Sequence, residues 1–298
     1  MYMKKLIEST RIGEPYIRRW MRSRPLVPVL TCTISFARCP AANDMVFFVC
    51  DIIEGRLGNA LPLLWHWYAF APMVAMQDLA EDGHPAKGGF LPPIPYERRM
   101  WASGDLHFYA PLRVGETIER RSVIANVVEK QGRSGGMAFV SVNHEYHGDA
   151  GLAVRERQEI VYLPIPRSFT PPPKQMAPSA DLLVDRAVDV NPALLFRYSA
   201  ITFNAHRIHY DLPYAQKVEA YPGLVVHGPL QAQLLAQEAT ELKGRAPSKF
   251  KFRGIHPMFH QGAMSLRATA GEAGTVDLCT AAGEGHIGVK ATASWEGL

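Results

Sequence analysis

The stretch GPLQAQLLAQEATELKG, residues 228–244, decides how the second half of the chain folds. Its apolar side chains recur at helical spacing and form one stripe, made of Leu230, Leu234, Leu235, Ala239 and Leu242. Proline is favoured in the first turn of a helix and glycine just past the last turn, and Pro229 and Gly244 occupy these places. The stretch therefore predicts one long helix with an apolar face to bury.

Strand patterns lie on both sides of this helix. Apolar and polar residues alternate at 101–109, 117–130, 137–146 and 152–163 before it, and at 250–259, 263–270, 276–281 and 287–295 after it. Such alternation between turn-forming residues indicates antiparallel strands with one buried face. A second apolar stretch, LPLLWHWYAFAPMVAMQDL at 61–79, precedes the first group of strands. Because it is apolar nearly all round, we expect a helix that is buried on most sides.

The two halves therefore repeat one plan of helix, loop and antiparallel strands. Each unit has a sheet face and a helix stripe to bury against each other, and two units can join their sheets side by side. We predict an α+β double hot-dog fold, in which two tandem units each wrap an antiparallel sheet around a long central helix. The units are expected at 1–163 and 186–298, with a proline-rich linker at 164–185. Two unrelated α+β domains are the alternative, but the spacing of the elements agrees as well as their type.

The composition is that of an ordinary globular protein and argues against several classes of function. The formal net charge of +4 over 298 residues forms no basic stripe, so nucleic acid is not an expected partner. The four cysteines lack the spacing of a zinc site or a disulfide framework, which fits a reducing cytoplasm. The apolar stretch at 25–53 is interrupted by Arg38, Pro40 and Asp44, and the N-terminus lacks a secretory pattern. We therefore expect no membrane segment and a cytoplasmic location.

The polar residues that can carry chemistry gather just before the long helix, in YSAITFNAHRIHYDLPYAQKVEAYPGLVVHGPL at 198–230. This stretch contains Asn204, His206, His209, Asp211 and His227, followed by Gly228 at the helix start. Histidine titrates near neutral pH and serves as a general acid or base. Two histidines three residues apart can also bind a metal ion, but no third ligand follows at the spacing of known zinc sites. No metal site is therefore predicted.

Two segments of this stretch, NAHRIHYD at 204–211 and YPGLVVHGPL at 221–230, resemble the hydratase motif of MaoC-like proteins of the hydroxyacyl-thioester dehydratase type 2 family. The first half is similar to the 3-methylfumaryl-CoA (mesaconyl-C4-CoA) hydratases of this family in LWHW at 64–67, GHP at 83–85, GGFLPP at 88–93, RRMW at 98–101 and GRSG at 132–135. The resemblance covers residues 60–298. It implies that the first unit is a degenerate hot-dog unit that binds substrate or coenzyme A, and that the second unit carries the hydratase motif.

The motif departs from the broader family at one position. R-specific hydratases have an aspartate two residues before an asparagine, and a histidine three residues after that asparagine. This chain has Asn204, His206 and His209 at these places, so the histidine is retained and the acid is not. The version with asparagine and histidine resembles the type 2 branch, and activity is therefore expected.

The resemblance implies reversible hydration of an enoyl-CoA, with 3-methylfumaryl-CoA converted to citramalyl-CoA. Hydration needs a base for water, an acid for the α-carbon and donors for the enolate oxygen. His209 suits both proton transfers, and the Asn204 amide can orient water or substrate. The backbone N–H of Gly228, at a helix N-terminus, can donate to the thioester oxygen. These three are the predicted catalytic residues.

The residues predicted to bind substrate are His206, Arg207, Tyr210 and His227. Arg207 is the candidate cation for the free carboxylate of a dicarboxylic acyl group, with Arg98 and Arg99 behind it. The histidines can instead brace the loop, and Asp211 is expected to accept structural hydrogen bonds. The aromatic residues Trp65, Trp67 and Tyr68 are expected in the core.

The predicted enzyme is an acyl-thioester hydro-lyase without metal or redox cofactor, with a coenzyme A thioester as substrate and a homodimer as the expected assembly. Three alternatives remain open. A 3-hydroxyacyl-carrier-protein dehydratase of fatty-acid synthesis would have a long apolar tunnel, whereas an arginine-closed pocket favours a short dicarboxylate. A hot-dog thioesterase usually needs a carboxylate where this chain has Asn204. An acyl-CoA-binding protein would have no activity.

Overall fold

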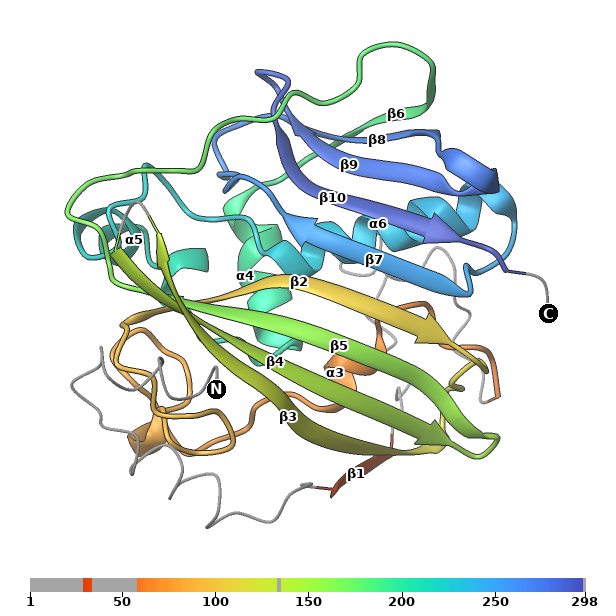
Figure 1. Ribbon diagram of the computed structural model, residues 1–298, viewed down its shortest axis with the longest axis horizontal. Coiled ribbons are helices and arrows are strands. Elements are labelled where there is room, and N and C mark those ends of the chain that lie inside the picture. The colour runs from red at the N-terminus through yellow and green to blue at the C-terminus, as the bar shows by residue number, and fades with distance from the viewer. Residues whose placement is uncertain (1–28, 34–57, 133–134, 297–298) are drawn as a thin grey trace.

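A computed structural model describes residues 29–33, 58–132 and 135–296 of the chain (Figure 1). Its strands are β1 (Val29–Thr33), β2 (Arg98–Phe108), β3 (Thr117–Gly132), β4 (Gly135–Gly148), β5 (Gly151–Leu163), β6 (Leu182–Val188), β7 (Lys249–Gly254), β8 (Met264–Ala270), β9 (Val276–Ala282) and β10 (Ile287–Ser294). Its helices are α3 (His66–Ala69), α4 (Pro192–Ile201), α5 (Leu212–Lys217) and α6 (Gly228–Lys243). Short 3-10 turns lie at η1 (Met76–Asp78), η2 (Arg207–His209) and η3 (Glu272–Gly274).

The described strands form one antiparallel sheet in the order β1-β3-β4-β5-β2-β7-β10-β9-β8-β6. The first five strands in this order come from the first half of the chain and the last five from the second half. The two halves meet where β2 pairs with β7, with Leu106 opposite Phe250. Both of these side chains are fully buried. The sheets of the two halves therefore join side by side, as the repeated plan predicted (Figure 1).

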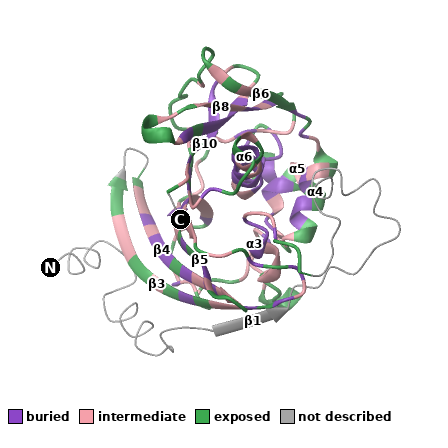
Figure 2. Ribbon diagram, turned by 90° about the vertical axis from the view of Figure 1, so that its right-hand side faces the viewer, coloured by how far each residue is buried: buried purple, intermediate pink, exposed green. Residues whose placement is uncertain are grey.

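The long helix of the second half is confirmed as α6, which lies inside the curve of the second-half strands (Figure 2). Pro229 lies in its first turn, and Gly244 ends it in the left-handed conformation with φ 67°. The predicted stripe faces the sheet, since Leu230, Leu234 and Leu235 are buried. The helix thus directs its N-terminus, at Gly228, toward the motif that precedes it.

The prediction of one helix at 61–79 is wrong. Within the described residues, this stretch contains only the four-residue helix α3 and the turn η1. Leu64 has φ 70°, which an α-helix excludes, and Pro72 has no N–H to donate to a helical carbonyl. The predicted burial is correct for Leu64 and Trp65 but wrong for residues 72–78, which are exposed, with Met73 at 77% and Met76 at 81%. The first half therefore packs an irregular apolar segment, instead of a long helix, against its curved sheet.

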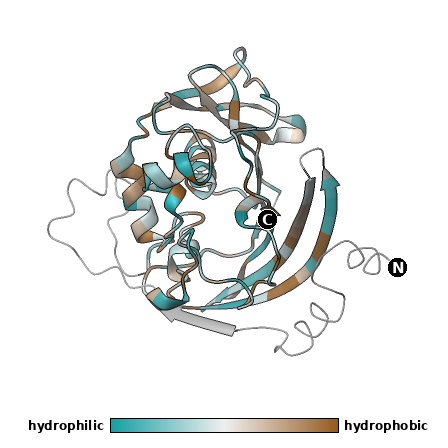
Figure 3. Cartoon of the chain, turned by 90° about the vertical axis from the view of Figure 1, so that its left-hand side faces the viewer, coloured by the Kyte–Doolittle hydropathy of each residue, from teal (hydrophilic) through white to brown (hydrophobic). Residues whose placement is uncertain are grey.

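Most strands lie within two or three residues of their predicted positions. The exception after α6 is β7, which ends at Gly254 although its pattern extended to residue 259. Hydrophilic and hydrophobic segments are mixed along the large curved sheet of the first half, consistent with one covered face (Figure 3).

The segment between β5 and α6 contains elements that the sequence did not predict. Strand β6 begins at Leu182, before the end of the predicted linker at residue 185. Helices α4 and α5 follow it and flank the turn η2. The domain boundaries themselves stay a prediction. Among the described residues, no helix combines the length and the apolar character needed to cross a lipid bilayer.

Candidate active site

The turn η2 carries His209 and is bracketed by two polar caps. The side chain of Asn204 accepts a hydrogen bond from the backbone N–H of His206 (3.1 Å), at the start of the turn. At its other end, Asp211 caps α5 by accepting from the N–H of Tyr214 (3.1 Å). Short polar side chains satisfy free backbone donors in this way at turns and helix starts. Asn204 therefore has its Oδ1 engaged by the turn, and Asp211 has the structural role that was expected of it.

His209 is held as a neutral base. Its Nδ1 lies 2.8 Å from the carbonyl oxygen of Val225, which can only accept a hydrogen bond. This bond assigns the proton to Nδ1 and leaves the lone pair on Nε2. Burial, followed by the nearby His227 and His206, lowers the pKa of His209 well below its usual 6.5. The side chain is therefore uncharged near pH 7 and can accept a proton at Nε2.

His227 stacks on the His209 ring, with the two centroids 3.6 Å apart and the planes 17° from parallel. Its Nε2 lies 2.9 Å from the Ser199 hydroxyl on α4, and the side chain has no exposed surface. Burial, with a smaller effect of His206, lowers its pKa to about 3. His227 is thus a neutral ring that supports one face of His209.

Gly228 follows His227 directly and begins α6. Its backbone N–H lies in the first helical turn, where N–H groups have no acceptor within the helix and the helix dipole favours negative charge. Apart from the adjacent residues and its own helix backbone, a Cβ built on Gly228 would have the carbonyl oxygen of Trp101 as its nearest neighbour, at 4.0 Å. The position therefore has open space beside a backbone donor, one residue away from the ring that stacks on His209.

His206 is anchored to a buried ion pair that connects the two halves. Its Nε2 lies 3.3 Å from Oε1 of Glu219, which is 1% exposed. Arg98 of β2 donates to the other carboxylate oxygen (2.7 Å) and to the Glu219 carbonyl (2.6 Å). Burial alone would raise the pKa of Glu219, but the His206 hydrogen bond and the Arg98 cation together lower it. The carboxylate is therefore ionised, and it holds His206 in place.

A histidine of the first half, His84, packs on His206 and is itself bonded to a second carboxylate. Asp82 bonds both the Nδ1 (2.9 Å) and the backbone N–H (2.9 Å) of His84. The His84 ring lies 4.1 Å from the His206 ring, centroid to centroid. Burial lowers the pKa of His84 to about 4, against the opposing effect of the Asp82 hydrogen bond. His206 is thus in contact with an imidazole from the first half and a carboxylate from the second.

Asp82, His84 and His206 each offer one ligand atom within 4.8 Å of the others, so a metal ion has to be considered. Two imidazoles on one tetrahedral ion place their ring centroids about 5 Å apart. The observed 4.1 Å and 40° tilt are closer to ring packing than to convergence of two nitrogens on an ion. Asp82 also bonds His84 directly. The geometry favours a hydrogen-bonded stack, and the absence of a metal cofactor stays a prediction.

The arginines predicted to bind a carboxylate differ in their present partners. Arg207 donates through Nε (2.9 Å) and through a terminal nitrogen (2.8 Å) to one oxygen of Asp211, and lies over the Tyr214 ring. Arg98 is paired with Glu219. Arg99 donates a long hydrogen bond to the carbonyl of Pro85 (3.3 Å) and also interacts with the hydroxyl of Tyr162. Of the three, Arg99 alone has no carboxylate partner among the described residues. Tyr210 is half-exposed and donates to the carbonyl of Ala205 (2.9 Å).

A family model for hydroxyacyl-thioester dehydratase type 2 matches residues 64–260, which include the whole of this site. The chain belongs to this family. It is 47% identical over 214 residues to the mesaconyl-C(4)-CoA hydratase of Chloroflexus aurantiacus, covering 70% of this chain and 75% of the relative. It is 25% identical over 236 residues to the mitochondrial hydroxyacyl-thioester dehydratase type 2 of Schizosaccharomyces pombe, covering 70% of this chain and 78% of that protein.

Solved structures with low sequence identity share the fold. The chain resembles HtdX of Mycobacterium tuberculosis with a TM-score of 0.61 and 18% identity, over 91% of this chain and all of that one. It resembles a MaoC-like dehydratase of Phytophthora capsici with a TM-score of 0.62 and 13% identity, over 91% and 96% of the two chains. A further M. tuberculosis protein, described as a double hotdog fold, matches with a TM-score of 0.55 and 11% identity, over 92% and 96%. The double hot-dog prediction is confirmed.

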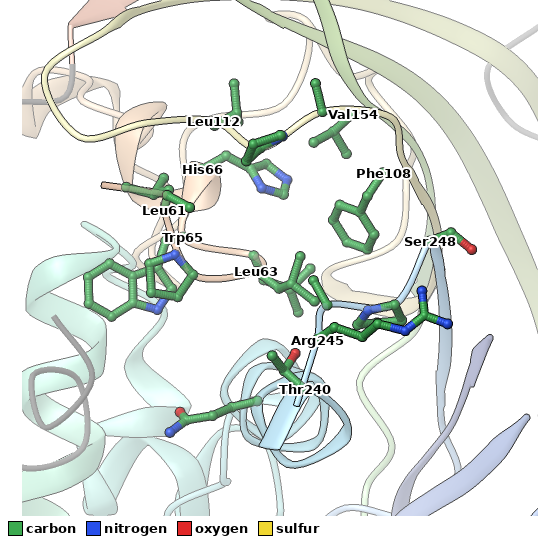
Figure 4. Close-up of a pocket in the computed structure, with 18 of the residues that line it drawn as sticks. Leu61, Leu63, Trp65, His66, Phe108, Leu112, Val154, Thr240, Arg245 and Ser248 are labelled. Carbon is green, nitrogen blue, oxygen red and sulfur yellow. The ribbon is translucent and has the colours of Figure 1, made fainter. Parts of the chain in front are cut away.

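In this member of the dehydratase family, a cavity of about 540 Å³ also lies between the first half and the side of α6 that carries Gln233 and Thr240 (Figure 4). Its walls are mainly apolar and include Leu61, Leu63, Leu64, Trp65, Phe108, Leu112 and Val154. His66 lines it too, with Nε2 at 3.5 Å from the buried carboxylate of Glu156. Arg245 and Ser248 line it from the segment that follows α6. The cavity lies beside α3, and none of the predicted catalytic residues lines it.

The sequence did not assign roles to Glu219, Asp82, His84 or Ser199, although all four lie in the histidine cluster. GHP at 83–85 supported the family resemblance, but His84 had no predicted function. One signal was available: a buried histidine pair needs carboxylates or carbonyls as partners, and the chain had no acid at residue 204 to supply one. Which distant acids fill that place depends on tertiary contacts.

Proposed function

We propose that this protein adds water reversibly across the double bond of an enoyl-CoA, with 3-methylfumaryl-CoA as substrate and citramalyl-CoA as product. Membership of the dehydratase family makes it an acyl-thioester hydro-lyase. The choice of substrate is supported by its 47% identity to a mesaconyl-C(4)-CoA hydratase. The observation that carries the chemistry is the bond from His209 Nδ1 to the Val225 carbonyl, because it leaves Nε2 as a free base beside the start of α6.

The proposed mechanism uses His209 twice. Its Nε2 removes a proton from water, and the oxygen attacks the β-carbon of the enoyl thioester. The electron pair of the double bond moves to the thioester oxygen, and the backbone N–H of Gly228 donates to the enolate that forms. The imidazolium then returns the proton to the α-carbon. Asn204 has a free amide N–H₂ to orient the water, since its Oδ1 accepts from His206.

The pH dependence follows from the environment of His209. Burial holds its pKa well below 6.5, so the neutral base persists when the pH falls through 6.5. We expect kcat to stay level from pH 8 to below 6.5 and to fall only in more acidic solution, as the imidazole becomes protonated. The measurement is kcat for hydration against pH, with the far-UV circular dichroism recorded at each pH to separate titration from unfolding. A midpoint near 6.5 would contradict the buried base.

The free carboxylate of the substrate needs a cation, and Arg99 is our candidate because Arg207 and Arg98 already have carboxylate partners. It is close enough to the histidine cluster for its charge to lower the pKa of His84. Replacing Arg99 with methionine is expected to raise KM for 3-methylfumaryl-CoA roughly tenfold or more, since a charge-assisted hydrogen bond contributes about 1.5–3 kcal/mol. Crotonyl-CoA, which lacks the carboxylate, is the control substrate, and its KM should change less than about twofold. Equal losses for both substrates would reject Arg99 as the carboxylate ligand.

A second candidate function is that of a 3-hydroxyacyl-carrier-protein dehydratase of fatty-acid synthesis, the first of the alternatives that the sequence left open. The mainly apolar cavity between the first half and α6 favours it, because about 540 Å³ can hold an acyl chain. A panel of enoyl thioesters, from 3-methylfumaryl-CoA to medium and long straight chains, distinguishes the two functions by the ratio of kcat/KM values. Release of free thiol from acyl-CoA would instead indicate a thioesterase. A homodimer, a cytoplasmic location and independence of cofactors stay predictions.

A further inference from the structure

A loop of the first half lies directly against the turn that carries His209. The carbonyl oxygen of Asp82 accepts the backbone N–H of Arg207 (2.9 Å), and the carbonyl of Glu81 accepts from the Arg207 guanidinium (3.2 Å). Gly83 has φ 87°, and a Cβ built there would lie 1.8 Å from the Ala205 carbonyl oxygen. Only a glycine permits this approach. The backbone of the loop at 81–84 is therefore docked on the turn η2.

The side chain of His84 extends this contact into the histidine cluster. Two bonds from Asp82 fix its backbone and its Nδ1, so the ring has one orientation. The His84 ring packs on His206 at 4.1 Å, and the His206 ring meets His209 edge to face at 5.5 Å and 88°. Three imidazole rings thus form a row in space, from His84 of the first half through His206 to His209, the proposed base.

The opposite side of His206 is also fixed. Glu219 bonds its Nε2, and Arg98 holds Glu219. The backbone of His206 is tied to both ends of the turn, because its N–H donates to Asn204 and its carbonyl accepts from the N–H of His209 (3.2 Å). His206 therefore connects the ring that packs on His84 to the backbone that carries His209. His84 supplies the contact that His206 receives from the first half.

We propose that His84, oriented by Asp82, is a positioning residue for catalysis: its ring packs on His206 and holds the turn η2 so that Nε2 of His209 faces the reacting water. The active site is then shared by both hot-dog units, and the first unit does more than bind substrate. The inference rests on the proposed hydration, in that its kinetic effect is measured as hydration. The geometry that it requires of His209 can be measured without any substrate.

The kinetic test compares three variants of the full-length protein. His84→Ala removes the ring and is expected to lower kcat roughly 10- to 100-fold, with KM within about twofold of wild type, because misplacing a catalytic group by about 1 Å costs up to about 100-fold. His84→Phe keeps a flat ring against His206 and should retain kcat within about fivefold. His286→Ala is the matched control, since His286 is also buried and packs on another histidine, His256, at 4.5 Å. It should leave kcat unchanged.

A positioning role also predicts the shape of the pH profile. In His84→Phe the dependence of kcat on pH should keep the wild-type shape, because His84 transfers no proton in the reaction. If His84→Phe loses as much activity as His84→Ala and its profile loses a limb, His84 takes part in proton transfer and the positioning role is wrong. Wild-type kcat in His84→Ala would also overturn it, as would a stoichiometric zinc ion bound by wild type and lost in this variant.

The substrate-free readout is the imidazole nitrogen spectrum of His209 in the 15N-labelled protein. Wild type should show a protonated, hydrogen-bonded Nδ1 and an unprotonated Nε2. This pattern should be retained in His84→Phe and lost or exchange-broadened in His84→Ala. An unchanged His209 pattern in His84→Ala rejects the proposal. If the pattern is lost but wild type hydrates no enoyl-CoA, the proposed function is wrong, and only the structural part stands: His84 orients the His209 ring.

Discussion

Replacing His209 with alanine is expected to lower kcat for enoyl-CoA hydration by roughly 10²- to 10⁴-fold, the usual contribution of a general acid–base residue. The reason is that Nε2 of His209 is the proposed acceptor for the proton of water and the donor to the α-carbon. The measurement is the decrease of absorbance of the enoyl thioester on hydration. KM should change little, since binding of the coenzyme A part does not depend on this side chain.

A second substitution distinguishes loss of the base from damage to the turn. His209→Asn places an amide N–H near the position of Nδ1, where it can still donate to the Val225 carbonyl. It lacks any group that accepts a proton at neutral pH. We therefore expect His209→Asn to be as inactive as His209→Ala but to unfold at a temperature closer to that of wild type. Substantial activity in His209→Asn would mean that His209 orients the site without acting as its base.

Gly228→Ala is expected to separate stability from activity. Apart from its chain neighbours and its own helix backbone, the added Cβ would meet no atom closer than 4.0 Å, so the surrounding elements can accept it. Alanine in place of a mid-helix glycine typically adds about 0.5–1 kcal/mol of stability. Pro229 disfavours helical backbone angles at a preceding alanine, so the net gain here should be smaller. The methyl group would occupy the space in which the thioester must approach the backbone N–H. We expect kcat to fall by roughly 10²-fold, as on loss of one oxyanion donor, with an unchanged or slightly higher melting temperature.

The matched control for this substitution is Gly254→Ala, at the end of β7. Its Cβ would lie 3.6 Å from the Ala102 carbonyl, an ordinary contact, at a glycine that is outside the proposed site. Hydration by Gly254→Ala should be close to wild type. If Gly228→Ala were fully active, the thioester oxygen would not be bound by this N–H, and the oxyanion donor would have to be another group.

Helix α6 and the strands show how much of the fold the sequence could predict. The stripe of leucines, Pro229 and Gly244 specify the helix locally, because a cap and a periodic apolar face act within a few turns. The stretch at 61–79 is also apolar, but its apolar residues do not form one periodic face. Pro72 interrupts it, and Leu64 takes a left-handed backbone conformation that no sequence pattern announced. Its first apolar residues, such as Leu64 and Trp65, are buried without the predicted helix, whereas Met73 and Met76 near its end are exposed.

The candidate site was likewise predicted only in part from the sequence. The motif predicted His209, Asn204 and Gly228 as the groups for hydration, and the three lie around the start of α6 and the turn η2. Arg207 was the predicted carboxylate ligand, but it is already paired with Asp211 at i+4, a neighbour that helix-like geometry brings within reach. Asn204 was expected to orient water, and it also caps the turn, which the sequence did not indicate.

The sequence by itself determined the double hot-dog class, the long second helix and the identity of the proposed base, since each depends on residues close together in the chain. Only the tertiary structure decided what surrounds that base. Arg98 reaches Glu219 across 121 positions, and Asp82 with His84 packs on His206 from the first half. These partners are selected by burial: an imidazole or a carboxylate removed from water must find a polar group in space, wherever in the chain that group lies. Local sequence patterns do not predict partners that are distant in the chain. The contacts proposed to position His209 could therefore be identified only from the structure of both halves.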